Sequence, residues 1–258
     1  MRNAKYYAVL TGDIRGSTSY HQVTKKSLEE PIASAFRIIE IWMPQLIYAP
    51  AQIFRGDSFQ VVLTDPAYAL RAAIIIRAAF RSFGKVYLPP RLLDCRIAIG
   101  IGKTELAKIY QNRSRYAEAE NVLRESPKIN RTETIINNYT SSWLGKAFMY
   151  SGALLDDKNS RRNIMVRTPW SNINNELKIE CALLDLIIEG WSYGRSEVMK
   201  YRIQGLKQKD ISNKLNVSQP AVNRRLMGAG DQVIDDLCRR FEQLIGDKIS
   251  DASYKLGI

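Results

Sequence analysis

The chain has 258 residues, 45% of them hydrophobic and 25% charged, which allows one large core or two modest ones and excludes a disordered, fibrous or low-complexity protein. The formal net charge of +12 favours phosphate-bearing partners such as nucleotides or nucleic acid, although good solubility is the simpler explanation. No apolar run is long enough to cross a bilayer and the first residues lack a cleavage-site pattern, so we expect a cytoplasmic protein without a membrane partner.

The first part of the chain alternates short apolar runs with longer amphipathic segments. Strands are predicted at Tyr6–Leu10, Ala51–Phe54, Ser58–Leu63 and Leu93–Ile101, and helices at Leu28–Leu46, Ala67–Phe83 and Ser114–Arg124. The second and third strands form a hairpin around Gly56, which can adopt the backbone angles of a tight turn. The order β-α-β-β-α-β is that of a ferredoxin-like palm, so the predicted fold class is α+β.

The uneven distribution of charge indicates two domains. Residues 1–165 contain 24 Lys and Arg against 14 Asp and Glu, whereas residues 166–258 contain 14 against 12. A polar stretch at 156–175, which includes Pro169, separates two regions of periodic apolar residues. We therefore predict one domain at 1–160, a linker at 161–176 and an all-α second domain at 177–250.

Two carboxylates are the first functional signal. Asp13 follows the first predicted strand and Asp57 lies at the hairpin tip, and a palm fold brings both to one edge of the sheet. Paired carboxylates can hold magnesium for phosphoryl transfer. The alternative is that each Asp only stabilises a glycine-containing turn. With three distant cysteines and His21 as the only histidine, a zinc finger is excluded and His-dependent catalysis is disfavoured.

Three motifs follow one another in this region: Thr11–Thr18 (TGDIRGST), Arg55–Phe59 (RGDSF) and Arg96–Gly102 (RIAIGIG). Together they resemble the strand signature of class III nucleotidyl cyclase catalytic domains. More narrowly, the chain resembles SatD-like bacterial proteins, which join such a domain to a C-terminal helix-turn-helix. The resemblance spans roughly Tyr6–Arg124 and Trp191–Phe241.

The resemblance implies a metal site and a catalytic role for three residues. Asp13 and Asp57 match the two metal-binding aspartates, and the carbonyl of Ile14 matches the backbone ligand. The implied cofactor is Mg²⁺ or Mn²⁺, and Asp13, Asp57 and Arg124 are the catalytic candidates.

The resemblance also implies a nucleoside triphosphate as partner. Gly16, Ser17 and Thr18, with Ile14, would bind the triphosphate where the chain enters a helix. Cyclases donate an Asn and an Arg across a dimer interface to hold the ribose and stabilise developing charge. Asn121 and Arg124 are the nearest matches here.

This sequence departs from the cyclase pattern in two ways. The spacing of the Asn and Arg candidates is one residue short, and Arg113, Arg115 and Lys128 are rivals for the cationic role. All of them could also form an exposed helix face. Ile53 lies near the position of the Lys that reads the purine base, and an Ile side chain has no hydrogen-bond donor. The sequence therefore leaves three alternatives to a purine cyclase open: a different nucleotide, a different phosphoryl-transfer reaction, or nucleotide binding without a reaction.

The second functional signal is a helix-turn-helix pattern. Helices are predicted at Arg195–Gln204, at Lys207–Leu215 and from Ser218 onward, with Asn216 and Val217 in the intervening turn. Ser218 is predicted to cap the last of these, and Pro220 suits its first turn. The apolar skeleton is Leu206, Ile211, Leu215, Val217, Val222 and Leu226.

This arrangement would project the second helix into a DNA major groove. Gln and Asn can bond adenine, Arg can read guanine, and Lys and Arg can contact phosphates. The candidates for contact with double-stranded DNA are Lys207, Lys209, Ser218, Gln219, Asn223, Arg224 and Arg225. The alternative is a helical hairpin used for dimerisation. Trp191 and Tyr193 are expected to pack in the core.

An amphipathic helix is predicted at Val233–Ile245, which could cover the helix-turn-helix or pair with a second copy. We expect a homodimer, because both the cyclase-like site and the helix-turn-helix would use one. Two functions remain open: a DNA-binding regulator that binds a nucleotide with magnesium, and an active nucleotidyl cyclase or related phosphoryl-transfer enzyme.

Overall fold

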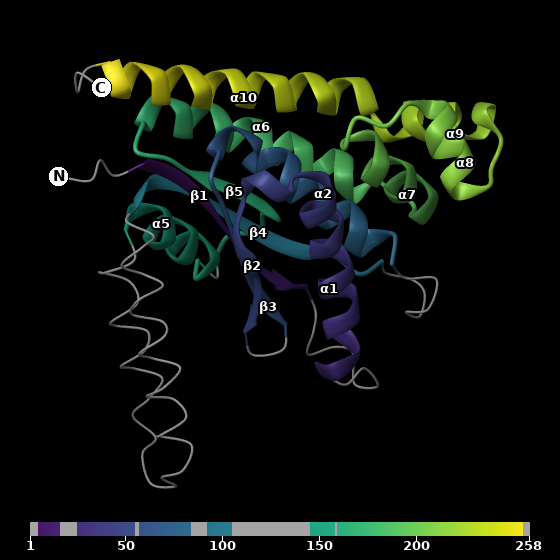
Figure 1. Cartoon of the computed structure of the whole chain (residues 1–258), viewed down its shortest axis with the longest axis horizontal. Coiled ribbons are helices and arrows are strands. Elements are labelled where there is room, and N and C mark those ends of the chain that lie inside the picture. Colours follow the sequence, from purple (N-terminus) through teal and green to yellow (C-terminus); the bar gives the residue numbers. More distant parts are fainter. Residues whose placement is uncertain are drawn as a thin grey trace, which may run out of the picture.

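The computed structural model describes residues 5–15, 25–54, 57–83, 92–104, 145–157 and 159–254. Within these ranges the chain has a mixed α+β fold, a five-stranded sheet followed by a helical C-terminal region (Figure 1). The strands are β1 (Lys5–Ile14), β2 (Ile47–Phe54), β3 (Ser58–Leu63), β4 (Cys95–Thr104) and β5 (Ile164–Arg167). The helices are α1 (Lys25–Trp42), α2 (Ala69–Arg81), α5 (Lys146–Leu155), α6 (Ser171–Glu189), α7 (Tyr193–Arg202), α8 (Gln208–Leu215), α9 (Gln219–Ala229) and α10 (Asp231–Tyr254).

The order β-α-β-β-α-β is confirmed from β1 to β4. The sheet is ordered β2-β3-β1-β4-β5, and only the β4–β5 pair is parallel. β1 is longer than its apolar run predicted, so Asp13 lies inside the strand, opposite Ser58 of β3 and Arg96 of β4. Pairing on both sides explains the extension, because two neighbours hydrogen-bond the polar end of the strand.

The two faces of the sheet are covered by different helices. Ala8 and Leu10 of β1 belong to a large core that includes residues of α1, α2 and α6. Val9 points to the other face and packs with residues of α5. α5 lies directly on β4, where a Cβ atom on Gly100 would be 2.0 Å from the Ala147 carbonyl oxygen. Only glycine allows this close approach.

β5 lies in the segment that we predicted as a linker, 161–176. Its four residues pair with β4, and the first turns of α6 follow in the same segment. The large core continues from β1 through α6 to α10. The division of the chain into two domains stays a prediction.

A buried ionic network joins α2, β4 and α6. Arg77 is fully buried and donates hydrogen bonds to Asp94 at 2.9 and 2.7 Å and to Asp185 at 2.7 Å, while Arg81 donates to Asp94 at 2.8 Å. Burial alone would raise the pKa of Asp94, but the charges and hydrogen bonds of Arg77 and Arg81 outweigh it, so this pKa is lowered. Asp185 also accepts backbone N–H groups of Asn163 and Ile164, which orders the start of β5.

The C-terminal helices are attached to the sheet-covering helices by further hydrogen bonds. Arg81 of α2 donates to the carbonyls of Glu189 and Trp191, and the Trp191 indole N–H donates to the Ala229 carbonyl at the end of α9. Trp191 is buried, as predicted. α10 is much longer than its predicted apolar stretch and runs along the molecule above α2 and α6 (Figure 1).

Candidate functional site

The two predicted aspartates meet at one end of the sheet. Asp13 pairs with Ser58 in the β1–β3 ladder, and the backbone N–H of Ile14 donates to the Asp57 carbonyl at 3.0 Å. Asp57 directly precedes β3, and its carboxylate accepts a hydrogen bond from the Ser58 hydroxyl at 3.4 Å. The palm topology predicted that Asp13 and Asp57 share one edge of the sheet, and the backbone of the chain does bring the two residues together there. The assignment of Asp13, Asp57 and the Ile14 carbonyl as metal ligands stays a prediction.

The carboxylate of Asp13 forms a salt bridge with Arg96. Its Nε and Nη2 donate to the two oxygens of Asp13 at 3.0 and 2.9 Å, a bidentate pair in which both side chains are only partly exposed. The hydrogen bonds from Arg96 to Asp13 raise the pKa of this guanidinium. The same Nη2 donates to the Leu155 carbonyl at 3.0 Å, so the pair is also tied to the end of α5.

Sequence reasoning did not identify Arg96 as a functional residue, although it lies in one of the three motifs. Asp13 and Arg96 are 83 positions apart, and only the β1–β4 register places them side by side. A cation at Asp13 must compete with a guanidinium that already neutralises the carboxylate. Among the described residues, no group of three or more His, Cys, Asp or Glu side chains is arranged to hold a metal.

A hydrogen-bonded chain lies next to the Asp13–Arg96 pair, on the face that α5 covers. The Thr11 hydroxyl donates to Ser151 of α5 at 3.0 Å and accepts from the Gln60 amide at 3.0 Å. Ser151 in turn donates to the Phe148 carbonyl. These contacts fix α5 on the sheet beside the aspartates.

Several predicted nucleotide-site residues lie outside the described part of the chain. They are Gly16, Ser17 and Thr18 of the first motif, Asn121, and the catalytic candidate Arg124. Gly56 and the rival cations Arg113, Arg115 and Lys128 also lie outside it, as does the predicted helix Ser114–Arg124. Their assignments stay predictions.

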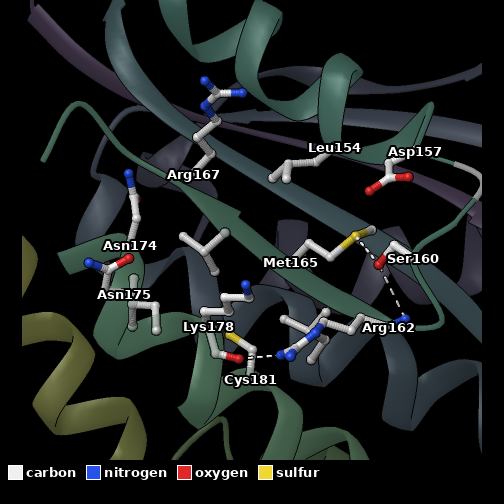
Figure 2. Close-up of a pocket in the computed structure, with 13 residues that line it drawn as sticks. Leu154, Asp157, Ser160, Arg162, Met165, Arg167, Asn174, Asn175, Lys178 and Cys181 are labelled. Carbon is white, nitrogen blue, oxygen red and sulfur yellow. Dashed lines mark hydrogen bonds between the residues drawn. The ribbon is translucent and has the colours of Figure 1, made fainter. Parts of the chain in front are cut away.

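A surface pocket of about 310 Å³ lies beside β5, between the end of α5 and α6 (Figure 2). Arg162, Arg167 and Lys178 give it a positive rim. Most of its polar groups bond to the chain itself: Arg162 donates to the Lys178 carbonyl, Arg167 lies 5.0 Å from the Tyr150 ring centroid, and the Asn174 amide bonds the backbone just after β5. We therefore do not place the nucleotide here.

As predicted, two short helices, α8 and α9, are joined by a tight turn. Asn216 ends α8 in a left-handed conformation with φ 51°, which Asn adopts more readily than most residues. The Ser212 hydroxyl donates to the Val217 carbonyl at 2.6 Å and closes the turn. Ser218 occupies the N-cap position of α9, but its side chain makes no capping hydrogen bond; its carbonyl accepts from the first turn instead.

The apolar skeleton packs inward as predicted. Ile211, Val222 and Leu226 are buried, and Leu206, Leu215 and Val217 pack against the same core. The outer face is polar. The exposed DNA-contact candidates are Lys207, Lys209, Ser218, Gln219, Asn223 and Arg224.

Three contacts refine the predicted DNA face. The Asn223 amide oxygen accepts from Gln208 of α8 at 3.1 Å, so this side chain is oriented across the two helices. Met227, one turn further along α9, is 71% exposed, and its sulfur accepts a weak hydrogen bond from the Asn223 amide nitrogen at 3.7 Å; sequence reasoning did not single this residue out. Arg225 lies differently from our prediction, because it turns toward α7 and pairs with Glu197 at 3.2 Å.

Several solved structures match part of the chain. Among solved structures, the guanylyl cyclase Cya2 is similar with a TM-score of 0.29 and 17% sequence identity. The match covers 40% of this chain and 58% of that protein, so it is weak and assigns no activity. No family model and no curated protein matches the sequence. In the described ranges, no helix combines the length and the apolar character needed to cross a membrane.

Proposed function

We propose that this protein is a DNA-binding regulator that reads double-stranded DNA through α8 and α9. We further propose that its N-terminal palm is of the nucleotidyl cyclase type and binds a nucleoside triphosphate with Mg²⁺ or Mn²⁺. The observation that carries the proposal is the outer face of α9, where Gln219, Asn223 and Arg224 are exposed above a closed turn and a packed skeleton.

The chemistry of this face suits the major groove. Gln219 presents an amide group of the kind that bonds adenine, and Arg224 has the fork that bonds guanine. The Asn223 amide would bond adenine in the same way after exchanging its contacts with Gln208 and Met227. Lys207 and Lys209 are exposed at the start of α8, where they can contact the phosphate backbone. These residues would therefore combine sequence reading with electrostatic attachment.

The proposed metal ligands are Asp13, Asp57 and the Ile14 carbonyl, a set of oxygen donors that hard cations prefer. A bound Mg²⁺ would neutralise the phosphates of the nucleotide at this strand end. Because Arg96 holds both oxygens of Asp13, metal binding would require Arg96 to leave. Arg96 also donates to the last carbonyl of α5, so its release would break a contact between the site and this helix.

An active phosphoryl-transfer enzyme is the second candidate, favoured by the two aspartates at one strand end. It needs Arg124 or another cation at the transferring phosphoryl group. The Asp57→Asn variant separates the two functions. An enzyme would lose product formation from nucleoside triphosphates with Mg²⁺ or Mn²⁺, whereas a sensor would form no product and lose only the effect of the nucleotide on DNA binding.

The test of DNA reading is selection from a random double-stranded library, followed by affinity measurement on the selected duplex. We expect one enriched sequence and a loss of affinity for it of about tenfold or more in Arg224→Ala. Arg239→Ala is the matched control, since Arg239 is 70% exposed on α10 and its substitution removes the same charge. No enriched sequence, or equal losses in both variants, would refute the proposal.

A homodimer completes the proposal, because a helix-turn-helix commonly reads two half-sites related by a two-fold axis.

A further inference from the structure

We infer that one face of α6, together with the start of α10, is the surface through which two copies of this chain associate. This inference names the contact for the dimer proposed above and rests on that part of the proposed function. The surface consists of Ile179, Leu183 and Leu186 of α6 and Val233 of α10. We call it the α6 patch.

The α6 patch is apolar and open to solvent. Ile179, Leu183 and Leu186 are 65%, 57% and 68% exposed, and their spacing of four and three residues places them on one side of the helix. Eight large hydrophobic side chains are exposed in the described ranges, and three of them form this stripe. Contiguous apolar patches of this kind mark interaction sites on soluble proteins.

Val233 extends the patch onto α10. The two helices run antiparallel, since Gly230 lies beside Ile187 and Arg240 pairs with Glu176 at 3.0 Å. Val233 precedes Arg240 by seven residues and therefore lies on the side of α10 that faces α6. It is 60% exposed, so the patch crosses from one helix to the next.

The charges at the two ends of the stripe favour a second copy as the occupant. Lys178 lies near the N-terminal end and Glu189 near the C-terminal end, and both are exposed. One oxygen of Glu189, Oε1, accepts from Asn163 at 2.8 Å and lies 3.4 Å from Arg15, so its other oxygen would take the partner's cation. Leu183 is five residues from Lys178 and six from Glu189. If two α6 helices cross antiparallel at Leu183, each Lys178 approaches the partner's Glu189, and the patch is complementary to itself.

A parallel arrangement lacks this pairing. Parallel helices would put Lys178 at the level of Lys178 and Glu189 at the level of Glu189, so neither side chain would meet an opposite charge. The antiparallel arrangement also aligns the helix dipoles favourably. A two-fold contact in which both copies use the same surface pairs the opposite charges and also places the helix dipoles antiparallel.

The first experiment measures mass in solution by light scattering at micromolar concentration. The full chain should have a mass of twice 29.4 kDa, and Leu183→Glu should reduce it to 29.4 kDa. Ile41→Glu is the matched control, because Ile41 is 74% exposed on α1, far from the patch in sequence, and should leave the dimer intact. Equal thermal melting of both variants and the wild type shows that the fold is preserved, and Leu183→Ser is a milder second variant.

The second experiment tests the orientation by disulfide formation. The three native cysteines are buried, so Leu183→Cys and Ile179→Cys each add an exposed thiol. In the antiparallel contact, Cys at 183 faces its copy and should cross-link, whereas two Cys at 179 lie about 12 Å apart along the axis and should not. Cross-linking of both variants would overturn the antiparallel contact.

Failure of this inference is distinguishable from failure of the proposed function. A wild-type mass of 29.4 kDa, or a dimer that survives Leu183→Glu, would overturn the α6 patch even if the chain reads DNA. A dimer that Leu183→Glu dissociates would support the patch even if no DNA sequence is selected.

Discussion

The two candidate regions of this molecule hold their charged groups in opposite ways. On α9, Gln219 and Arg224 are exposed and available to an incoming base edge. At the end of the sheet, Asp13 is already bonded to Arg96 through both oxygens. The proposed DNA face could therefore receive a partner as it stands, whereas the proposed metal site would first have to exchange an internal cation for an external one. The two regions should respond differently to substitution.

The largest effect is expected where the two regions are joined. Arg77→Ala removes the fully buried cation between Asp94 and Asp185, which leaves Asp94 with Arg81 alone and Asp185 with no cation. Breaking a buried pair in this way costs about 3–5 kcal/mol. Urea unfolding of the full chain measures the loss. The exposed control Arg239→Ala should change the free energy of unfolding by no more than about 0.5 kcal/mol, and equal losses in the two variants would contradict the role of the network.

A smaller effect is expected on the DNA face. Asn223→Ala should reduce discrimination at one adenine of the selected site by about 1–3 kcal/mol, because a bidentate amide contact is lost. Competition between the selected duplex and single-base variants measures it. Asn175→Ala, an exposed Asn on α6, should leave the discrimination unchanged. An unchanged base preference in Asn223→Ala would remove this residue from the reading surface.

The aspartate site should respond in the opposite direction, with a gain of affinity. Arg96→Gln frees the Asp13 carboxylate and removes its internal competitor, so Mn²⁺ should bind more tightly, by about tenfold or 1.4 kcal/mol. Electron paramagnetic resonance of free Mn²⁺ measures this without any activity. Arg167→Gln removes the same charge from β5 and should have little effect. Weaker or equal Mn²⁺ affinity in Arg96→Gln would show that the two aspartates are not a cation site.

The smallest effect concerns acid stability. The pKa of Asp94 is lowered by Arg77 and Arg81, so its stabilising contribution is complete above the unfolded pKa near 4 and is lost as the pH falls through the lower folded value. Between pH 4 and pH 3, the melting temperature should fall by about 2–4 °C for each kcal/mol lost. Asp94→Asn should show a smaller fall over the same interval. Parallel curves would mean that other carboxylates account for the acid dependence.

Local patterns in the sequence predicted most of the fold and the positions of several candidate site residues. Apolar periodicity located α2, α8 and α9, because each buries a continuous stripe of its own residues. The helix-turn-helix followed from neighbours in sequence, such as Asn216 in the turn and Pro220 after it. The meeting of Asp13 and Asp57 followed from topology, once the strand order was known.

The features that sequence reasoning missed depend on distant partners. β5 has only four residues in a polar stretch and exists because it pairs with β4 and because Asp185 bonds its first N–H groups. Arg96 resembles a surface residue until the β1–β4 register places it against Asp13. Arg77 lies in an Ala- and Ile-rich helix, and only the fold shows that two carboxylates surround it.

The attachment of α9 has a consequence for the proposed DNA site. Arg81 bonds the carbonyls of Glu189 and Trp191, and Trp191 bonds the end of α9, so a series of hydrogen bonds links α9 to α2 on the sheet. In the proposed two-fold dimer, recognition helices held in this way would set the separation of the two half-sites, near a whole number of turns of about 10–10.5 base pairs. A single inserted base pair between half-sites would then rotate one of them away from its helix.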